Sequence, residues 1–483
     1  MTTSPDTTAS PQSPESSGPR GYQYRWMVMA VVIVADVMDL LDATIANLAG
    51  PSIRADLGGS ESTLQWVLAA YTISFAIGLV VSARAGDLVG RRRMFIIGMA
   101  GFTAASLLCG LAPTAGTLIA FRVLQGAFGA VMIPQGLAMV KQSFHPDDLQ
   151  KAFIPFGPIM GLAAVLGPIL AGFLIDADLF GTGWRMIFLI NIPVGVVGTV
   201  LAVKYLPEVP RNRETRLDVV GSLLLAVASA LLIYPLVQGR EHDWPLWCFL
   251  MMGASAITFA AFVVSERRSA HPVIERSLFR NRGFVAGVVF LATFFVAMNG
   301  VLLIVNLFVQ LGLGFTPMRT GLAMTPLALG LAVGAATSGA ALGPRFGRKV
   351  LHGGLVVIAL GMVALWWTID RQGMSVGAWD LAPALFVTGL GSGAIFAPLF
   401  DIILADLGDQ EVGTGSGVLN AAQQFSGALG VAIIGTIFFQ WLPDEGWADA
   451  TKGILWVSIA CYAVSFLVAF LLPKEAREGA ELA

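Results

Sequence analysis

The strongest constraint on the fold is a series of long apolar segments separated by short clusters of charged residues. A helix that crosses the hydrocarbon core of a bilayer, about 30 Å thick, needs roughly 20 mostly apolar residues. We therefore predict an all-α membrane protein whose chain crosses the bilayer fourteen times. The predicted spans lie at residues 26–47, 64–84, 94–112, 117–140, 153–175, 184–206, 217–237, 245–265, 284–311, 320–343, 350–369, 379–404, 414–440 and 453–473.

Composition supports a membrane fold and excludes several classes of function. Apolar residues make up 56% of the 483 residues and charged residues 12%, whereas soluble domains contain about 45–50% and about 25%. With a net charge of −2, the chain has no overall basic field to attract nucleic acid. It contains neither a Cys/His zinc spacing nor a Walker phosphate loop, so we expect no metal, no other cofactor and no ATP-driven transport.

Cysteine and histidine form no constellation that would indicate an enzyme. The cysteines lie far apart in apolar segments, where each is expected to act as a small apolar residue. The histidines fall in or beside predicted loops, where we expect them to be solvated. These residues are Cys109, Cys248 and Cys461, and His145, His242, His271 and His352.

Basic residues indicate how the chain is oriented, because loops on the cytoplasmic side retain Lys and Arg. With both termini placed in the cytoplasm, most basic residues fall in inner loops, such as those at 91–93, 211–216 and 345–349. The outer loops contain only Arg54, Arg185, Arg240, Arg319, Arg371 and Lys452. This asymmetry fits an even number of spans and predicts a multi-pass protein of the cytoplasmic (inner) membrane, with the lipid bilayer around it.

A short sequence pattern occurs twice. The loop after the second span reads Val-Gly-Arg-Arg-Arg at 89–93, and the loop after the tenth reads Phe-Gly-Arg-Lys at 346–349. If the two loops occupy equivalent positions in two six-helix halves, spans seven and eight are an inserted pair and the arrangement is six plus two plus six. Such repeats are typical of transporters, whose substrate site lies near the midplane between the halves. The alternative is a common positively charged loop without a repeat.

The repeat divides the chain into five parts. Ser, Thr and Pro are frequent before residue 20, so this stretch lacks the apolar pattern of a packed element and is expected to be disordered. An uncleaved first span follows, without a signal-peptide cleavage site. The predicted parts are a disordered cytoplasmic tail at 1–22, a six-helix bundle at 23–208, an inserted helix pair at 209–270, a second six-helix bundle at 271–474 and a cytoplasmic tail at 475–483.

The first span contains an aspartate at every third position, Asp36, Asp39 and Asp42. At about 100° per residue, the three cover an arc of about 120° on one face of the helix. A carboxyl group at membrane depth is costly unless it faces a polar interior, and burial and mutual repulsion favour its protonated form. We predict that these groups bind and release protons. The alternative is that they only form hydrogen bonds to neighbouring helices.

Arg122 lies near the outer end of the fourth span, in the sequence Phe-Arg-Val-Leu-Gln-Gly. Because the first span runs outward and the fourth inward, Asp42 and Arg122 fall at a similar depth, roughly 8 Å from the outer edge by helix rise. An arginine stays charged and holds a paired carboxylate ionised until a ligand or proton competes. We predict that the two residues pair and couple transport to protons. Snorkelling of Arg122 to the outer interface is the alternative.

The loop after the second span contains residues suited to a latch, that is, a contact that closes the cytoplasmic side. Gly90 permits a tight turn before Arg91 and Arg92. Asp87 can accept hydrogen bonds from helix-terminal amides or from arginines of the same loop. We predict a gating contact on the cytoplasmic side, with a plain topogenic loop as the alternative.

Two further sets of residues allow more than one interpretation. In the fifth span, Gly161, Gly167, Pro168 and Gly172 permit close helix packing and bending, which fits either a hinge or packing alone. Amides in the ninth and thirteenth spans could line a substrate cavity or join helices to each other. These amides are Asn299, Asn306, Gln310, Asn420, Gln423 and Gln424.

After residue 20, essentially the whole chain resembles the fourteen-helix drug/proton antiporter branch of the major facilitator superfamily. Residues 41–47 resemble the first-helix signature of that branch, and 87–93 resemble the loop motif of the superfamily. Residues 122–126 are similar to the fourth-helix motif, whose arginine the family ties to proton coupling. Residues 161–172 resemble the fifth-helix pattern associated with antiport, and 184–191 are similar to the connector that follows it.

The chain also departs from the family pattern. Ala83 stands where the loop motif usually has glycine, Leu88 where a basic residue is common, and Pro344 where the second copy would have its aspartate. The predicted tenth and thirteenth spans contain no Asp or Glu in their cores, although some relatives that export cationic drugs have acids there. Coupling would then depend on the first span.

The resemblance implies a proton-coupled antiporter that exports small amphipathic compounds, such as antibiotics or other drugs, and confers resistance. It implies protons and one amphipathic compound as partners and no nucleic acid. We expect the protein to act as a monomer. An importer or facilitator of a metabolite would have the same fold and remains the alternative.

Overall fold

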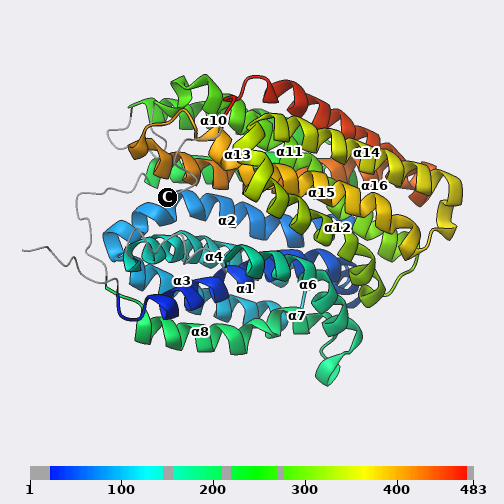
Figure 1. Ribbon diagram of the computed structural model, residues 1–483. Coiled ribbons are helices and arrows are strands. Elements are labelled where there is room, and N and C mark those ends of the chain that lie inside the picture. Colours follow the sequence, from blue (N-terminus) through cyan, green and yellow to red (C-terminus); the bar gives the residue numbers. More distant parts are fainter. Residues whose placement is uncertain (1–21, 145–155, 209–218, 269–276, 476–483) are drawn as a thin grey trace, which may run out of the picture.

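The computed structural model describes residues 22–144, 156–208, 219–268 and 277–475, and these residues form an all-α structure (Figure 1). The first helices are α1 (Arg25–Leu57), α2 (Glu61–Val89), α3 (Arg91–Gly110), α4 (Ala115–Ser143), α6 (Phe156–Asp176), α7 (Met186–Leu189) and α8 (Asn191–Tyr205). The others are α9 (Val219–Gln238), α10 (Leu246–Arg268), α11 (Arg282–Leu307), α12 (Pro317–Thr337), α13 (Gly343–Phe346), α14 (Lys349–Gln372), α15 (Ala378–Ile403) and α16 (Asp409–Ala469). Residues 1–21 and 476–483, which hold the predicted tails, lie outside the described residues.

Short turns of other helix types link or extend these helices. The π-helical turns η5 (Phe308–Gly312) and η6 (Ser338–Leu342) continue α11 and α12. The 3-10 turns are η1 (Leu179–Gly181), η2 (Gly183–Arg185), η3 (Arg240–His242), η4 (Leu278–Arg280) and η7 (Gly373–Ser375).

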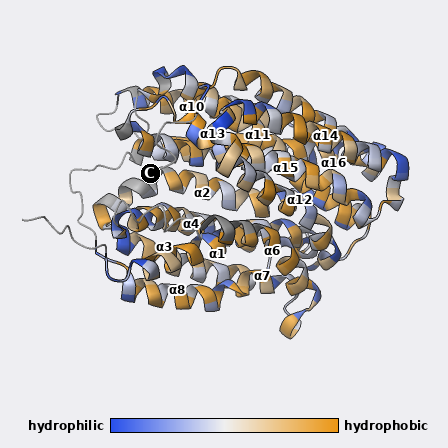
Figure 2. Ribbon diagram, in the orientation of Figure 1, coloured by the Kyte–Doolittle hydropathy of each residue, from blue (hydrophilic) through white to orange (hydrophobic). Residues whose placement is uncertain are grey.

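Within the described residues, 11 helices are long and apolar enough to cross a membrane, which confirms the all-α membrane architecture. In Figure 2 the ribbon is coloured by residue hydropathy, and hydrophobic residues occur along the length of these helices. The first predicted span lies in α1, whose apolar stretch is interrupted by three aspartates, and most of the fifth lies in α6. The last two predicted spans both lie in α16, where Gly446 breaks the helical backbone with a φ of 76°.

The helix ends coincide with residues that suit them. The Thr114 hydroxyl accepts a hydrogen bond from the backbone N–H of Thr117 (3.2 Å) and caps α4. The Asn281 side chain likewise accepts from the N–H of Phe284 (3.0 Å) and caps α11. Gly90 alone separates α2 from α3 and has a φ of 107°, which favours glycine because other residues have a Cβ atom.

The long helices pack as two groups, each with an apolar core, and the core of the second group also includes Ala46, Leu64 and Leu68 of the first. In the first group α2 and α3 pack against α4, and the core includes Phe95 and Phe102. In the second group α11 packs against α16, and α12 and α14 pack against α15, around a core that includes Phe290 and Phe294. In Figure 1 the blue to teal helices and the green helix α8 belong to the first group, and the yellow to red helices belong to the second.

Helices α9 and α10 pack against each other, and α9 also contacts one helix from each group, α2 and α16. Ile233 of α9 lies in an apolar cluster with Ala69 of α2 and Ala432 of α16. The Thr436 hydroxyl of α16 donates to the Leu236 carbonyl of α9 (2.6 Å). Helix α9 therefore covers a seam between the two groups.

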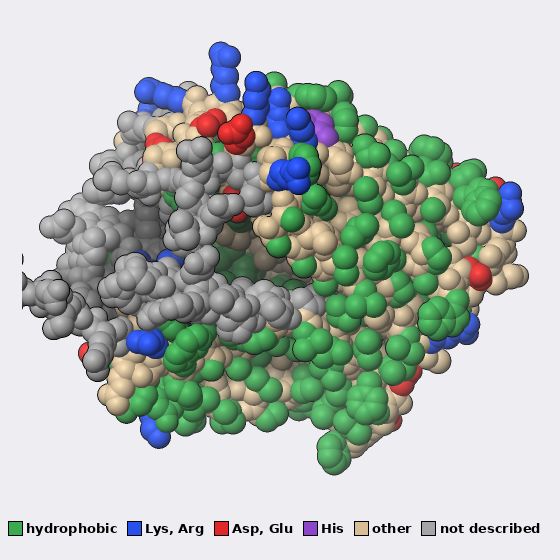
Figure 3. Space-filling model, in the orientation of Figure 1, with side chains coloured by type: hydrophobic (Ala, Val, Ile, Leu, Met, Phe, Trp, Pro, Cys, Tyr) green, Lys and Arg blue, Asp and Glu red, His purple; other side chains and the backbone are tan. Residues whose placement is uncertain are grey.

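The two groups touch at one end of the molecule and part at the other. At the end opposite the chain termini, the side-chain amide of Asn306 donates to the Asn47 carbonyl and that of Gln310 to the Leu48 carbonyl, both at 2.9 Å. At the end where the C-terminus lies, Figure 3 shows the surface hollowed between the groups. Helix α1 therefore makes contacts with the second group at the closed end.

Candidate functional site

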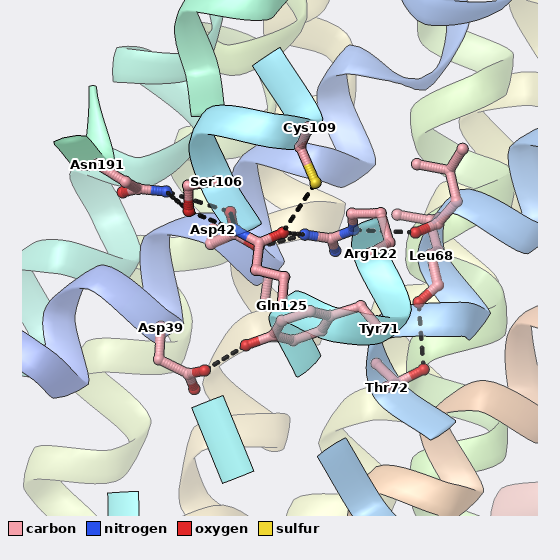
Figure 4. Close-up of polar contacts among 12 residues, drawn as sticks. Asp39, Asp42, Leu68, Tyr71, Thr72, Ser106, Cys109, Arg122, Gln125 and Asn191 are labelled. Carbon is pink, nitrogen blue, oxygen red and sulfur yellow. Dashed lines mark hydrogen bonds and ion pairs between the residues drawn. The ribbon is translucent and has the colours of Figure 1, made fainter. Parts of the chain in front are cut away.

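Asp42 of α1 and Arg122 of α4 form an ion pair inside the first group of helices (Figure 4). The Asp42 residue is 3% exposed and Arg122 is 1% exposed. The predicted pairing is therefore confirmed. Arg122 does not snorkel to the interface.

Side chains from three further positions complete the surroundings of the pair (Figure 4). The Gln125 amide donates to Asp42 (2.7 Å) and to the Ser106 hydroxyl (2.8 Å), and its oxygen accepts from Arg122 (2.8 Å). The Asn191 amide donates to Asp42 at 3.3 Å. Both carboxylate oxygens of Asp42 are thus satisfied, which is the condition under which a charge can be buried without a large penalty.

Arg122 also contacts α2. Its Nε donates to the Val67 carbonyl (3.1 Å), and its guanidinium carbon lies 4.3 Å from the centre of the Tyr71 ring. The face of an aromatic ring attracts a cation, more strongly when both are shielded from water. Five helices therefore hold the guanidinium and its carboxylate partner in one position: α1, α2, α3, α4 and α8.

Tyr71 connects this pair to a second aspartate. Its hydroxyl donates to Asp39, one turn before Asp42 on α1. Asp36 and Asp39 are partly buried, and Asp36 has no hydrogen-bond partner among the described residues. The three aspartates therefore share a face of the helix, as their spacing predicts, but have different surroundings.

The predicted latch loop is described only in part. The side chain of Asp87 lies outside the described residues, so its predicted hydrogen bonds do too. Arg92 donates to the Glu208 carboxylate (3.0 Å) and to the Val203 carbonyl (2.6 Å), both at the end of α8. Arg92 thus ties the start of α3 to α8. Arg91 follows Gly90 as the first residue of α3.

The glycine motif of the fifth span lies where α6 meets α1 and α12. A Cβ atom on Gly172 would come within 2.5 Å of the Met318 backbone, whereas one on Gly167 would have its nearest neighbour, Leu41, at 3.4 Å. The Pro168 carbonyl lies against Gly321 of α12. The side-chain surroundings of Gly161 lie outside the described residues. The motif therefore allows close contact between the two groups of helices.

The amides predicted to line a cavity fall into two kinds. Asn306 and Gln310 are buried and donate to α1 carbonyls, which fits the alternative of a contact between helices. The other four do not bond across the groups in this way. Asn299 and Asn420 donate to carbonyls of their own helices, and Gln423 and Gln424 are partly buried in α16.

The connector after α6 anchors the C-terminal end of α1. Arg185 forms an ion pair with Asp56, and the Trp184 indole donates to the same carboxylate (3.0 Å). Asp56 lies beyond the first predicted span, and these two hydrogen bonds hold the pKa of its carboxyl below the usual value. The connector motif thus contributes an ion pair and a hydrogen bond that hold the end of α1.

Four residues of the network were not predicted as site residues: Tyr71, Ser106, Gln125 and Asn191. Gln125 carried a usable signal, because it follows Arg122 by three positions and so lies on the same helix face. Tyr71, Ser106 and Asn191 come from other helices, and their spacing in the sequence has no relation to Asp42.

The prediction that His352 is solvated is wrong. Its ring packs against Phe466 and Phe470 of α16, with ring centres 4.7 and 4.5 Å apart. The reason is that α14 begins at Lys349, so His352 lies in the first turn of a helix and faces the end of α16. The cysteines are free, and two of them, Cys109 and Cys248, are buried.

Comparison with known proteins places the chain in one family. The model of the Major Facilitator Superfamily matches residues 32–431 and also residues 289–481. A probable actinorhodin transporter of Streptomyces coelicolor is 49% identical over 91% of this chain and 76% of that protein. A puromycin resistance protein of Streptomyces alboniger is 34% identical over 98% and 94%. A tetracenomycin C resistance and export protein of Streptomyces glaucescens is 30% identical over 90% and 80%.

Solved structures agree on the fold. A peptide transporter of the POT family in complex with sulfate has a TM-score of 0.67 at 14% identity, covering 92% of this chain and 95% of the other. A nucleoside transporter has a TM-score of 0.62 at 12% identity, covering 92% and 100%. The helical architecture, the buried ion pair and the family match lead to one conclusion: the chain is a membrane protein that belongs to the Major Facilitator Superfamily.

Proposed function

We propose that the protein is a proton-coupled antiporter that exports small amphipathic compounds across the cytoplasmic membrane and thereby confers resistance to them. Three relatives are named for transport of actinorhodin, resistance to puromycin, and resistance to and export of tetracenomycin C. The single observation that carries the coupling is the buried network around Asp42 and Arg122, beside two further aspartates.

The three aspartates have different parts in this proposal. Three donors, from Arg122, Gln125 and Asn191, satisfy the Asp42 carboxylate in its ionised form. Asp39 has the Tyr71 hydroxyl, and Asp36 has no hydrogen-bond partner among the described residues. We infer that Asp36 and Asp39 exchange the proton, while the ion pair fixes the helices that surround them.

The position of α1 explains how a proton would affect the whole transporter. This helix contacts α2, α4, α6 and α8 of the first group and α11 and α12 of the second. We infer that the partial exposure of Asp36 and Asp39 is exposure to the interior between the groups. Protonation of Asp36 or Asp39 would therefore change the charge on α1, the helix that also makes the contacts at the closed end. Each 100 mV of membrane potential supplies about 2.3 kcal/mol per charge moved, which suffices for concentrative export.

We further propose fourteen spans in a six plus two plus six arrangement, with both termini in the cytoplasm and a monomer as the active unit. The bundles at 23–208 and 271–474 then surround the substrate path, and the pair at 209–270 covers a seam between them. Support comes from the contacts of α9 with α2 and α16, from the break of α16 at Gly446 and from the basic loops.

The test is proton movement evoked by a compound in inverted membrane vesicles that contain the protein and a pH-sensitive dye. Actinorhodin, puromycin and tetracenomycin C are the first compounds to try. We expect at least one to dissipate an imposed proton gradient with the wild type. Asp39→Asn, Asp42→Asn and Arg122→Ala should abolish this response.

Asp444→Asn is the matched control, because Asp444 is exposed at the closed end and far from the network in sequence. It should retain the response, and size-exclusion profiles should show that all variants are folded. If labelled compound moves through the wild type without any proton movement, coupling is wrong and a facilitator is the better description.

A further inference from the structure

A groove of about 450 Å³ runs along the outside of the second group of helices, between α12 and α14. Leu390, Gly391 and Ala394 of α15 are among the residues that line it, together with Gly353 and Gly354 of α14. At Gly353, a Cβ atom would have no neighbour within 4 Å. The groove is therefore an unfilled apolar space.

The groove opens to the membrane side of the molecule. Leu342 and Phe346, which also line it, are 38% and 45% exposed, as is usual for side chains that face lipid. The lining residues of α14 run from Lys349 to Val357, about 12 Å by helix rise. One leaflet of the hydrocarbon core is about 15 Å thick, so the groove spans most of one leaflet.

One end of the groove is basic. Lys349 lines it, is exposed, and has no hydrogen bond or ion pair with the described residues. Arg345, also exposed, lies four positions before it. Arg348 is held elsewhere, because it donates to the Phe470 and Leu472 carbonyls, both at 2.7 Å. These two bonds also place the basic end beside the C-terminal end of α16.

We propose that this groove binds an anionic phospholipid of the leaflet on the side of the chain termini. An acyl chain lies along Gly353 and Gly391, and the phosphate is held by Lys349 and Arg345. A zwitterionic lipid would offer the same acyl chain but no net negative charge to this end. The site is independent of the proposed transport function, because it shares no residue with the aspartate network.

The experiment measures the melting temperature of the full-length protein in detergent during titration with dioleoyl phosphatidylglycerol or dioleoyl phosphatidylcholine. A ligand that binds the folded state raises the melting temperature in a way that yields an apparent Kd. We expect tighter binding of phosphatidylglycerol to the wild type. Lys349→Gln should weaken it about fivefold, the effect of one charge near an anionic headgroup.

Gly353→Leu tests the acyl part of the site, since it adds a side chain to the groove lining at a position where a Cβ atom has no neighbour within 4 Å. It should weaken phosphatidylglycerol binding about tenfold or more, because each methylene that is no longer buried reduces the affinity. Gly253→Leu in α10 is the matched control, since a Cβ atom there also has no neighbour within 4 Å. Lys141→Gln, at an exposed lysine of α4, is the control for charge. Both controls should bind as the wild type does.

Three results would overturn the proposal. The first is equal affinity for the two lipids in the wild type. The second is wild-type affinity in Gly353→Leu. The third is equal stabilisation by glycerol 3-phosphate, which has the anionic group without acyl chains and would identify a simple phosphate site instead of a lipid site.

Discussion

At the scale of single residues, the buried pair of Asp42 and Arg122 makes the stability of the fold depend on both members. Removing one member of a buried ion pair costs about 3–5 kcal/mol, because the remaining charge is left without a partner. Here the remaining charge would also lie among donors or acceptors arranged for the complete pair, such as Gln125. The pair therefore specifies how α1 and α4 face each other.

This leads to a prediction for a double-mutant cycle. Arg122→Gln alone should lower the free energy of unfolding by about 3–5 kcal/mol, since it leaves the Asp42 carboxylate unpaired. Asp42→Asn combined with Arg122→Gln should lose clearly less than the sum of the single changes. The measurement is denaturant unfolding in detergent. Additive losses would show that the two residues do not stabilise each other.

At the scale of elements, α6 brings its glycines to two different neighbours. Gly172 lies against the start of α12 in the second group, where its missing Cβ atom allows backbone contact. Gly167 lies against α1 within the first group, where a Cβ atom would have ordinary contacts. The two glycines of one motif therefore have different functions, and only Gly172 controls how closely the groups approach.

Alanine at these two glycines should separate the two functions. Gly172→Ala overpacks the contact between α6 and α12, which typically costs about 1–3 kcal/mol. The state in which the two groups touch at the closed end should therefore become about fivefold to a hundredfold less favourable. Transport of the compound found in the vesicle assay should fall accordingly. Gly167→Ala should keep wild-type transport and melting temperature. Similar losses in both variants would contradict this assignment.

At the scale of the whole molecule, the structure has its groups in contact at one end only. The bonds of Asn306 and Gln310 to α1 join the groups there. If the transporter alternates between two states, these bonds exist only in the state described. A contact that forms in only one of two states changes the free-energy difference between the states by the free energy of that contact.

Alanine at both amide positions should therefore favour opening of this end. Each lost hydrogen bond changes the balance by about 1 kcal/mol, or about fivefold. Distances between spin labels at Phe180→Cys and Trp379→Cys, which replace side chains that are 94% and 87% exposed, report the opening. We expect a larger fraction of long distances in the double alanine variant.

Asn299→Ala is the control for this measurement, because the Asn299 amide donates to a carbonyl of its own helix. It should leave the distance distribution unchanged. An unchanged distribution in the Asn306 and Gln310 variant as well would mean that these bonds do not hold the end closed.

Features that depend on local geometry along the chain could be predicted from the amino-acid sequence. Apolar length predicted the spanning helices, because each must cover the hydrocarbon core with its own backbone bonds satisfied. The three-residue spacing placed Asp36, Asp39 and Asp42 on one face. Helix rise alone brought Asp42 and Arg122 to the same depth, and the ion pair between them is present.

Which faces of these helices meet could be learned only from how the helices pack. Helices that are apolar all round give no signal for their rotation, because lipid and protein neighbours are equally apolar. The partners from other helices, Tyr71 and Asn191, therefore could not be found from spacing. The same reason left the roles of Asn306 and Gln310 open and led to the wrong expectation for His352. Depth in the membrane follows from position along a helix, whereas contact also requires the rotation that packing sets.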